Sequence, residues 1–183
     1  MCVWKYKGHA RDQERQKQVK MYLYRVLGVI VHGDAAMSGQ GVVWESLGFQ
    51  DLVDYSPGGI IHIVYNNQIG FTTPPKQGRS SYYCTEIAKA VDAPVIHVNA
   101  DVPDILDKIM KIAVAYRQKF NKDIFIDIVG YRRYGHNEQD QPAFTQPKIY
   151  EKIKEHPTCY DFYSQKLLQR GVVTEQDLKN LKN

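Results

Sequence analysis

The sequence has few cysteines and no long apolar run. Its three cysteines, Cys2, Cys84 and Cys159, lie far apart and form no Cys-x-x-Cys pair, so we expect reduced, inert thiols rather than a disulfide framework. No stretch approaches the roughly 18 apolar residues that a membrane-spanning helix needs, and no membrane span is expected. Residues 1–26 are basic, but they lack an apolar core and contain acidic residues, which argues against a secretory signal.

The sequence also lacks an excess of one charge and the common phosphate-binding signatures. It has 24 basic and 20 acidic residues, a net charge of +4, and both signs are interspersed, so we expect no nucleic-acid binding. There is no G-x-x-x-x-G-K-[ST] motif. In "GQGVVW", Trp44 stands where a dinucleotide fingerprint would have its third glycine.

What the sequence does contain is an alternation of apolar strands and helices. Short, β-branched runs predict four strands, at 25–34, 60–67, 94–100 and 123–131, and the first two of them are predicted to be buried. Between and after the strands, helices are predicted at 38–53, 85–93, 101–120, 148–156, 159–171 and 173–183. This rhythm predicts an α/β fold, a parallel sheet with helices on both faces.

Two of these helices carry more detailed expectations. In the helix at 85–93, Thr85 is a plausible N-cap. The helix at 101–120 is amphipathic. We predict its buried face to consist of Ile105, Ile109, Ile112, Ala113 and Tyr116.

Polar residues gather where the strands end, which is where ligands bind in parallel α/β sheets. Asp34 offers a carboxylate, Asn67 an amide oxygen, and the turn at 68–70 a backbone carbonyl. This mixed oxygen set suits Mg²⁺ that also takes phosphate oxygens. The small residues Ala35 and Ala36 would let a phosphate approach the backbone, and a helix opening near 39–42 would direct N–H groups at it. The alternative reading is a helix cap and an ordinary turn.

Gly33-Asp34 and Asn66-Asn67, with 33 positions from Asp34 to Asn67, resemble the thiamine-diphosphate-binding motif, although Ala35 replaces the glycine that usually stands at its third position. The segments "HGDAAMSGQGVVWE", "VYNNQIGFTT", "RSSYYCTEIAKAVDAPVIHVNAD" and "DIFIDIVGYRRYGHNEQDQPAFTQPKIYEKI" together resemble the E1 component of 2-oxoglutarate dehydrogenase. That family includes a 2-oxoadipate-type branch. The resemblance runs from about residue 29 to the C-terminus.

The resemblance implies the thiamine-diphosphate-binding fold and a set of site residues. Mg²⁺ would be ligated by the side chains of Asp34 and Asn67 and by the backbone carbonyl of Ile69. His136, in "YRRYGHNE", would reach the cofactor diphosphate and is the candidate catalytic residue. The full set of implied cofactor-binding residues is Asp34, Ala35, Ala36, Asn67, Ile69 and His136.

Several nearby residues are given no chemistry. His32 and His97 lie in apolar strands, so we predict hydrogen-bonded core histidines. Arg79-Ser80-Ser81 resembles a family loop near the subunit contact. Gln141 departs from the family, which usually has Glu at that position.

The resemblance divides the chain into three parts. These are a divergent basic segment (1–28), a diphosphate- and Mg-binding α/β domain (29–156) and a C-terminal helical segment (157–183). In the family a pyrimidine-binding domain, whose glutamate activates the cofactor, normally follows. We therefore expect this chain to be incomplete, and inactive on its own.

The implied activity is that of an oxidoreductase of the tricarboxylic acid cycle. It would decarboxylate 2-oxoglutarate or 2-oxoadipate with thiamine diphosphate and Mg²⁺, and pass the acyl group to a lipoyl-bearing E2. A homodimer is expected, in the mitochondrial matrix if the source is eukaryotic and in the cytoplasm if it is bacterial. The alternatives are a non-catalytic binding or regulatory subunit and a degenerate paralogue.

Overall fold

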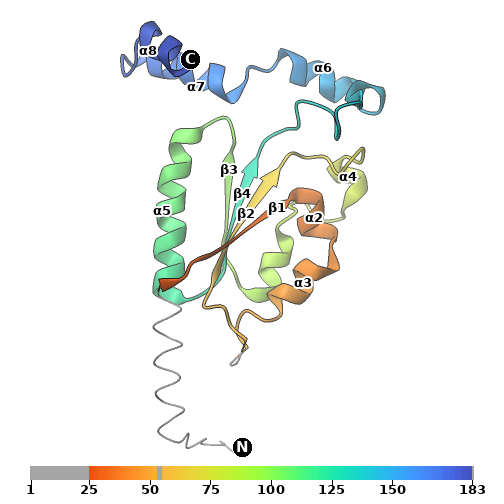
Figure 1. The fold of residues 1–183 in the computed structure, drawn as a ribbon. Coiled ribbons are helices and arrows are strands. Elements are labelled where there is room, and N and C mark those ends of the chain that lie inside the picture. The colour runs from red at the N-terminus through yellow and green to blue at the C-terminus, as the bar shows by residue number, and fades with distance from the viewer. Residues whose placement is uncertain (1–24, 53–54, 183) are drawn as a thin grey trace, which may run out of the picture.

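The computed structural model describes residues 25–52 and 55–182, and its centre is one parallel sheet (Figure 1). The four strands are β1 (Gly28–Gly33), β2 (Ile60–Asn66), β3 (Val95–Asn99) and β4 (Ile124–Val129). They lie in the order β1-β2-β4-β3, and every neighbouring pair is parallel. All four predicted strands are confirmed.

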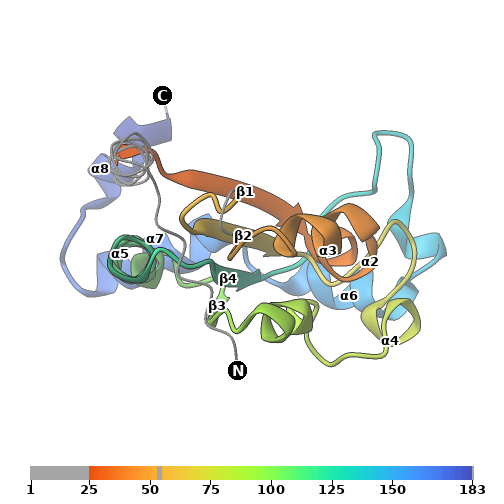
Figure 2. The ribbon, with the colours of Figure 1, turned by 90° about the horizontal axis from the view of Figure 1, so that it is seen from below.

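Helices cover both faces of the sheet, as predicted (Figure 2). One face packs against α2 (Asp34–Gly39), α3 (Gly41–Leu47) and the 3₁₀ helix η1 (Glu86–Val91). The other face packs against the long helix α5 (Pro103–Phe120). Alternate strand residues supply the two cores, because successive side chains of a strand point to opposite faces: Val64 of β2 joins the first and Ile61 the second.

The prediction that the first strand is buried is wrong. β1 is an edge strand, and Val29, Ile30 and Val31 are 47%, 38% and 57% exposed. The prediction failed because a continuous apolar run is typical of a strand covered on both sides. Within the described ranges, β1 has only β2 as a neighbour.

The predicted face of the long helix is only partly correct. Ile109 and Ala113 are buried, whereas Ile105 and Ile112 are 42% and 57% exposed. Arg117 takes the next buried position, one turn beyond Ala113, and its Nε donates to the carbonyl of Gly59 at 2.8 Å. A charged residue can occupy this face because its donors find backbone acceptors there.

Two predicted helices differ from the structure in detail. The helix predicted to open near 39–42 is confirmed as α3, which begins at Gly41, but the short helix α2, which begins at Asp34 itself, was not predicted. The segment after Thr85 is a 3₁₀ helix, and the Thr85 side chain, which is 1% exposed, makes no capping hydrogen bond.

The last third of the chain crosses the carboxyl end of the sheet (Figure 1). It contains η2 (Pro142–Phe144), α6 (Pro147–Glu155), α7 (Cys159–Gln169) and α8 (Glu175–Lys182). A single helical turn, α4 (Pro75–Gly78), lies earlier in the chain, between β2 and η1. Lys166 of α7 donates to Asp104 of α5 at 3.0 Å, which ties the two helices together. None of the helices in the described part of the chain is long and apolar enough to cross a membrane.

Candidate functional site

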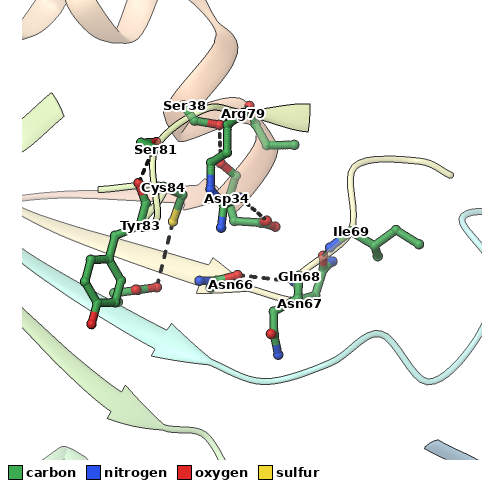
Figure 3. A network of polar contacts seen from close by, with 12 residues as sticks. Asp34, Ser38, Asn66, Asn67, Gln68, Ile69, Arg79, Ser81, Tyr83 and Cys84 are labelled. Carbon is green, nitrogen blue, oxygen red and sulfur yellow. Dashed lines mark hydrogen bonds and ion pairs between the residues drawn. The ribbon is translucent and has the colours of Figure 1, made fainter. Parts of the chain in front are cut away.

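Asp34 lies buried where β1 passes directly into α2. Its side chain is 3% exposed, and its Oδ2 accepts a hydrogen bond from Arg79 Nη1 at 3.3 Å (Figure 3). Burial raises the pKa of the Asp34 carboxyl, and the neighbouring Arg79 guanidinium only partly opposes that rise. The contact with Arg79 therefore does not fully offset the cost of removing the Asp34 carboxylate from water.

The end of β2 forms two successive side-chain turns. Asn66 Oδ1 accepts from the N–H of Gln68 at 3.2 Å, and Asn67 Oδ1 accepts from the N–H of Ile69 at 3.1 Å. Such turns are a common local role of asparagine. The alternative prediction, that these residues form an ordinary turn, therefore describes their hydrogen bonds. In Figure 3 the Asn67 side chain points away from Asp34.

The two strand ends nevertheless adjoin one another. Gly33 pairs with Tyr65 in the sheet, so Asp34 and Asn67 follow paired positions at the same edge. Beyond them, a Cβ placed on Gly70 would lie only 2.7 Å from the Cβ of Ala35. The absence of a side chain at Gly70 thus lets the turn after β2 reach the start of α2. Ala35 is exposed and Ala36 half-buried at this point.

The loop after β4 is fastened to the same turn. Gln68 Nε2 donates to the carbonyl of Gly130 at 2.7 Å, and Arg132 Nη2 donates to the carbonyl of Phe71 at 2.8 Å. His136 is exposed, and its ring meets the ring of Phe71 edge-on at 5.0 Å between centroids. The structure therefore places His136 beside the turn that carries Asn67 and Ile69.

A cavity of about 670 Å³ adjoins that turn, between the carboxyl edge of the sheet and α6. Asn67 and Ile69 line one wall, His97 and Asn99 of β3 another, and His156 closes it from the end of α6. The cavity therefore gives access to the turn that carries Asn67 and Ile69.

The two strand histidines are hydrogen-bonded, as predicted, but neither is buried in the core. His32 Nε2 lies 2.9 Å from His62 Nδ1, and His97 Nδ1 lies 2.7 Å from Asp127 Oδ2. His32 is half-buried, and His97 is exposed at the cavity. Burial, with a smaller contribution from His62, lowers the pKa of His32 to about 4, so His32 is neutral at physiological pH.

A buried acid and thiol lie behind the site. Asp127 is fully buried in β4, and Cys84 Sγ is 4.0 Å from its Oδ1. Burial, aided by the charge of Asp127, raises the pKa of Cys84 to about 12, so its thiol stays protonated and a poor nucleophile. This agrees with the expectation of inert thiols for Cys84, whereas Cys2 lies outside the described residues.

Two residues at or near the candidate site, Arg79 and Asp127, were not predicted from the sequence. Arg79 was given no chemistry, and no local signal links it to Asp34, 45 positions earlier. Asp127 did leave a signal, because a charged residue in the middle of the apolar run "IFIDIV" must find a partner when it is buried.

The residue types at this edge match the ligands of a magnesium diphosphate, although the Asn67 side chain is turned away from Asp34 in this structure. The donor set is one carboxylate, one amide oxygen and a backbone carbonyl, which matches the hard oxygen ligands that Mg²⁺ prefers. The Nε of Arg79 is a buried donor with no hydrogen-bond partner among the described residues, which suits an added anion. Gly70 and Ala35 keep their contact free of larger side chains.

Comparison with known proteins identifies the family. The family model described as "Dehydrogenase E1 component" matches residues 10–183. The match therefore extends into the segment 1–28, which the motifs alone had left outside the resemblance.

Three relatives illustrate the similarity. The mitochondrial 2-oxoglutarate dehydrogenase of Dictyostelium discoideum is 49% identical over 175 residues, which cover 96% of this chain and 16% of the relative. The 2-oxoglutarate dehydrogenase E1 component of Haemophilus influenzae is 51% identical, covering 87% of this chain and 17% of the relative. The 2-oxoglutarate dehydrogenase E1 component of Bacillus subtilis is 48% identical, covering 85% of this chain and 16% of the relative.

The chain thus spans about one sixth of the length of these relatives. The family match nevertheless runs through every element of the sheet and through the site at its edge. The chain belongs to the dehydrogenase E1 component family.

Proposed function

We propose that this chain is the thiamine-diphosphate- and Mg²⁺-binding part of a 2-oxo acid dehydrogenase E1. The observation that carries the proposal is the meeting of two strand ends, with a buried carboxylate on one and an amide–carbonyl turn on the other. When bound, the cofactor supplies the electron sink for decarboxylation of a 2-oxo acid. The residues of this chain hold and orient its diphosphate end.

Each residue has a role that its position supports. Asp34 provides the anionic ligand to the metal, because its buried carboxylate gains most from a divalent cation. The amide oxygen of Asn67 has two lone pairs, so it can keep its bond to the Ile69 N–H and offer the second pair to the ion. The Ile69 carbonyl is the third ligand.

Other residues contact the diphosphate. Ala35 and Ala36 border it, since they present little bulk at the start of α2. His136 reaches it from the loop after β4 as a hydrogen-bond donor. Its exposure leaves the ring free to turn from Phe71 towards an anion at the turn.

The family membership supports a proposal for the activity of the whole enzyme. We propose decarboxylation of 2-oxoglutarate, the substrate that the relatives' names print, with 2-oxoadipate as the alternative substrate. The acyl group would pass to the lipoyl group of an E2 within the tricarboxylic acid cycle. A homodimer would complete the site, in the mitochondrial matrix if the source is eukaryotic and in the cytoplasm if it is bacterial.

Calorimetric titration with thiamine diphosphate and Mg²⁺ tests the proposal. We expect the Asp34→Ala variant to lose most of the affinity that the unmodified chain shows, since the metal loses its anionic ligand. Asp107→Asn is the matched control, because it removes one acidic charge from an exposed position on α5. Equal affinity in the unmodified chain and in Asp34→Ala would end the assignment.

A further inference from the structure

Among the described residues, Arg79 is held at the site with most of its side-chain donors unused. Its side chain is only 10% exposed, and its single contact with Asp34 is at 3.3 Å. Its Nε is buried without a hydrogen-bond partner in the part of the chain that the structure describes. A guanidinium has five donors in a planar fork suited to two oxygens at once. The buried guanidinium of Arg79, which contacts Asp34 through one nitrogen, therefore has donors without a hydrogen-bond partner among the described residues.

Asp34 is incompletely satisfied as well. Its carboxylate is 3% exposed, and among the described residues its cationic neighbour is Arg79, which reaches it through one nitrogen at 3.3 Å. The acid has capacity for a stronger cation, and the arginine has capacity for an anion with several oxygens. A divalent cation that carries a diphosphate supplies both together.

We propose that Arg79 is an exchange residue, which neutralises Asp34 before the metal enters and transfers its guanidinium to the diphosphate afterwards. This inference rests on the proposed function, because it assumes the metal at Asp34. Mg²⁺ alone would have to displace Arg79 and then lie beside an unpaired buried cation. Mg²⁺ with a diphosphate gives that cation a partner. Arg79 therefore makes binding of the metal and of the anion interdependent.

Manganese and inorganic pyrophosphate are suitable probes for this coupling. Binding of Mn²⁺ to the purified chain is followed by electron paramagnetic resonance, with and without pyrophosphate. Pyrophosphate binding at saturating Mn²⁺ is followed by calorimetry. The unmodified chain is expected to bind Mn²⁺ at least about tenfold more tightly when pyrophosphate is present, a difference that corresponds to one charge-assisted contact.

Substitution of Arg79 should separate the two affinities. In Arg79→Gln, Mn²⁺ alone binds several-fold more tightly, because the competing cation is gone. Pyrophosphate binds about tenfold more weakly, because its buried partner is gone. Arg79→Lys keeps the charge and loses the fork, so only pyrophosphate binding weakens. Lys76→Gln removes an exposed cation from the neighbouring turn α4 and should change neither affinity.

The outcomes distinguish this inference from the function on which it rests. If Asp34→Asn abolishes Mn²⁺ binding while Arg79→Gln leaves both affinities unchanged, the exchange role is overturned and the metal site stands. If Arg79→Gln weakens Mn²⁺ alone, Arg79 merely supports the site and the inference is again overturned. If the unmodified chain binds neither Mn²⁺ nor its pyrophosphate complex, the proposed function fails together with it. Circular dichroism checks the fold of each variant, and Arg79→Lys carries the test if Arg79→Gln is unfolded.

Discussion

Asp34 and Gly70 define the candidate site in different ways, one by its charge and the other by its size. The Asp34 carboxylate is almost fully buried, and the cost of that burial favours occupation by a cation. Gly70 has no such chemistry, yet the space for a methyl group is already filled by Ala35. Gly70 thus allows the two strand ends to approach each other because it has no side chain.

Gly70 yields a prediction on stability. In Gly70→Ala the new Cβ would meet Ala35 Cβ at 2.7 Å, so either the turn or the start of α2 must move. We expect a loss of roughly 1–3 kcal/mol in the free energy of unfolding, typical of overpacking, measured by urea denaturation. Gly39→Ala is the control, because nothing lies within 4 Å of a Cβ at that position. Equal stability of the two variants would show that the contact is not tight.

At the scale of elements, β1 and β2 are joined by side chains as well as by their backbones. His32 of β1 contacts His62 of β2, and His62 Nε2 lies 3.3 Å from Asp123 Oδ2 at the start of β4. Asp123 in turn accepts from the Ile60 N–H at 2.8 Å. This chain of contacts links three strands.

The burial of His32, with a smaller contribution from its neighbour His62, predicts a pH dependence. The pKa of His32 is about 4 in the folded chain against an ordinary 6.5, so between these values the unfolded chain binds more protons. The free energy of unfolding should therefore fall as the pH falls from 6.5 towards 4. His32→Gln, which keeps an N–H donor and does not titrate, should show a shallower fall in urea denaturation at pH 7 and pH 5.

The control for this effect is His136→Gln, which alters an exposed histidine and should retain the full fall. If the two glutamine variants had the same pH dependence of the free energy of unfolding, His32 would not be the source of that dependence.

The helices that cross the sheet edge depend on their caps. Thr158 Oγ1 accepts from the Asp161 N–H at 3.1 Å, and Asp161 Oδ2 accepts from the Thr158 N–H at 3.3 Å, which forms a capping box at α7. Thr158→Ala should cost about 1 kcal/mol in the free energy of unfolding, measured by thermal denaturation. Thr158→Ser, which retains the acceptor oxygen, should recover most of it. A fully stable Thr158→Ala would mean that α7 contributes nothing to the cooperative unit.

For the whole molecule, the parts of the fold that rest on local patterns were predictable. Apolar runs located all four strands, and polar residues at their ends located the edge that carries Asp34 and Asn67. Properties that depend on distant neighbours were not predictable. β1 has the pattern of a buried strand and lies at an edge, and Arg79 reaches Asp34 from a loop that has no signal of its own.

The site itself divides in the same way. Asp34, Asn67 and the turn at 68–70 could be placed together, because carboxyl ends of neighbouring parallel strands meet. The buried guanidinium beside them, which changes the electrostatics of the proposed metal position, became visible only with the three-dimensional arrangement.

The most direct test of the account is a crystal of this chain grown with Mn²⁺ and thiamine diphosphate, measured for anomalous scattering by manganese. The account predicts one strong manganese peak about 2.1 Å from an Asp34 carboxylate oxygen, the Asn67 Oδ1 and the Ile69 carbonyl oxygen, the distance typical of small divalent ions with oxygen ligands. It also predicts that the diphosphate completes the shell. A manganese peak bound elsewhere, or a bound cofactor whose metal does not touch Asp34, would contradict it.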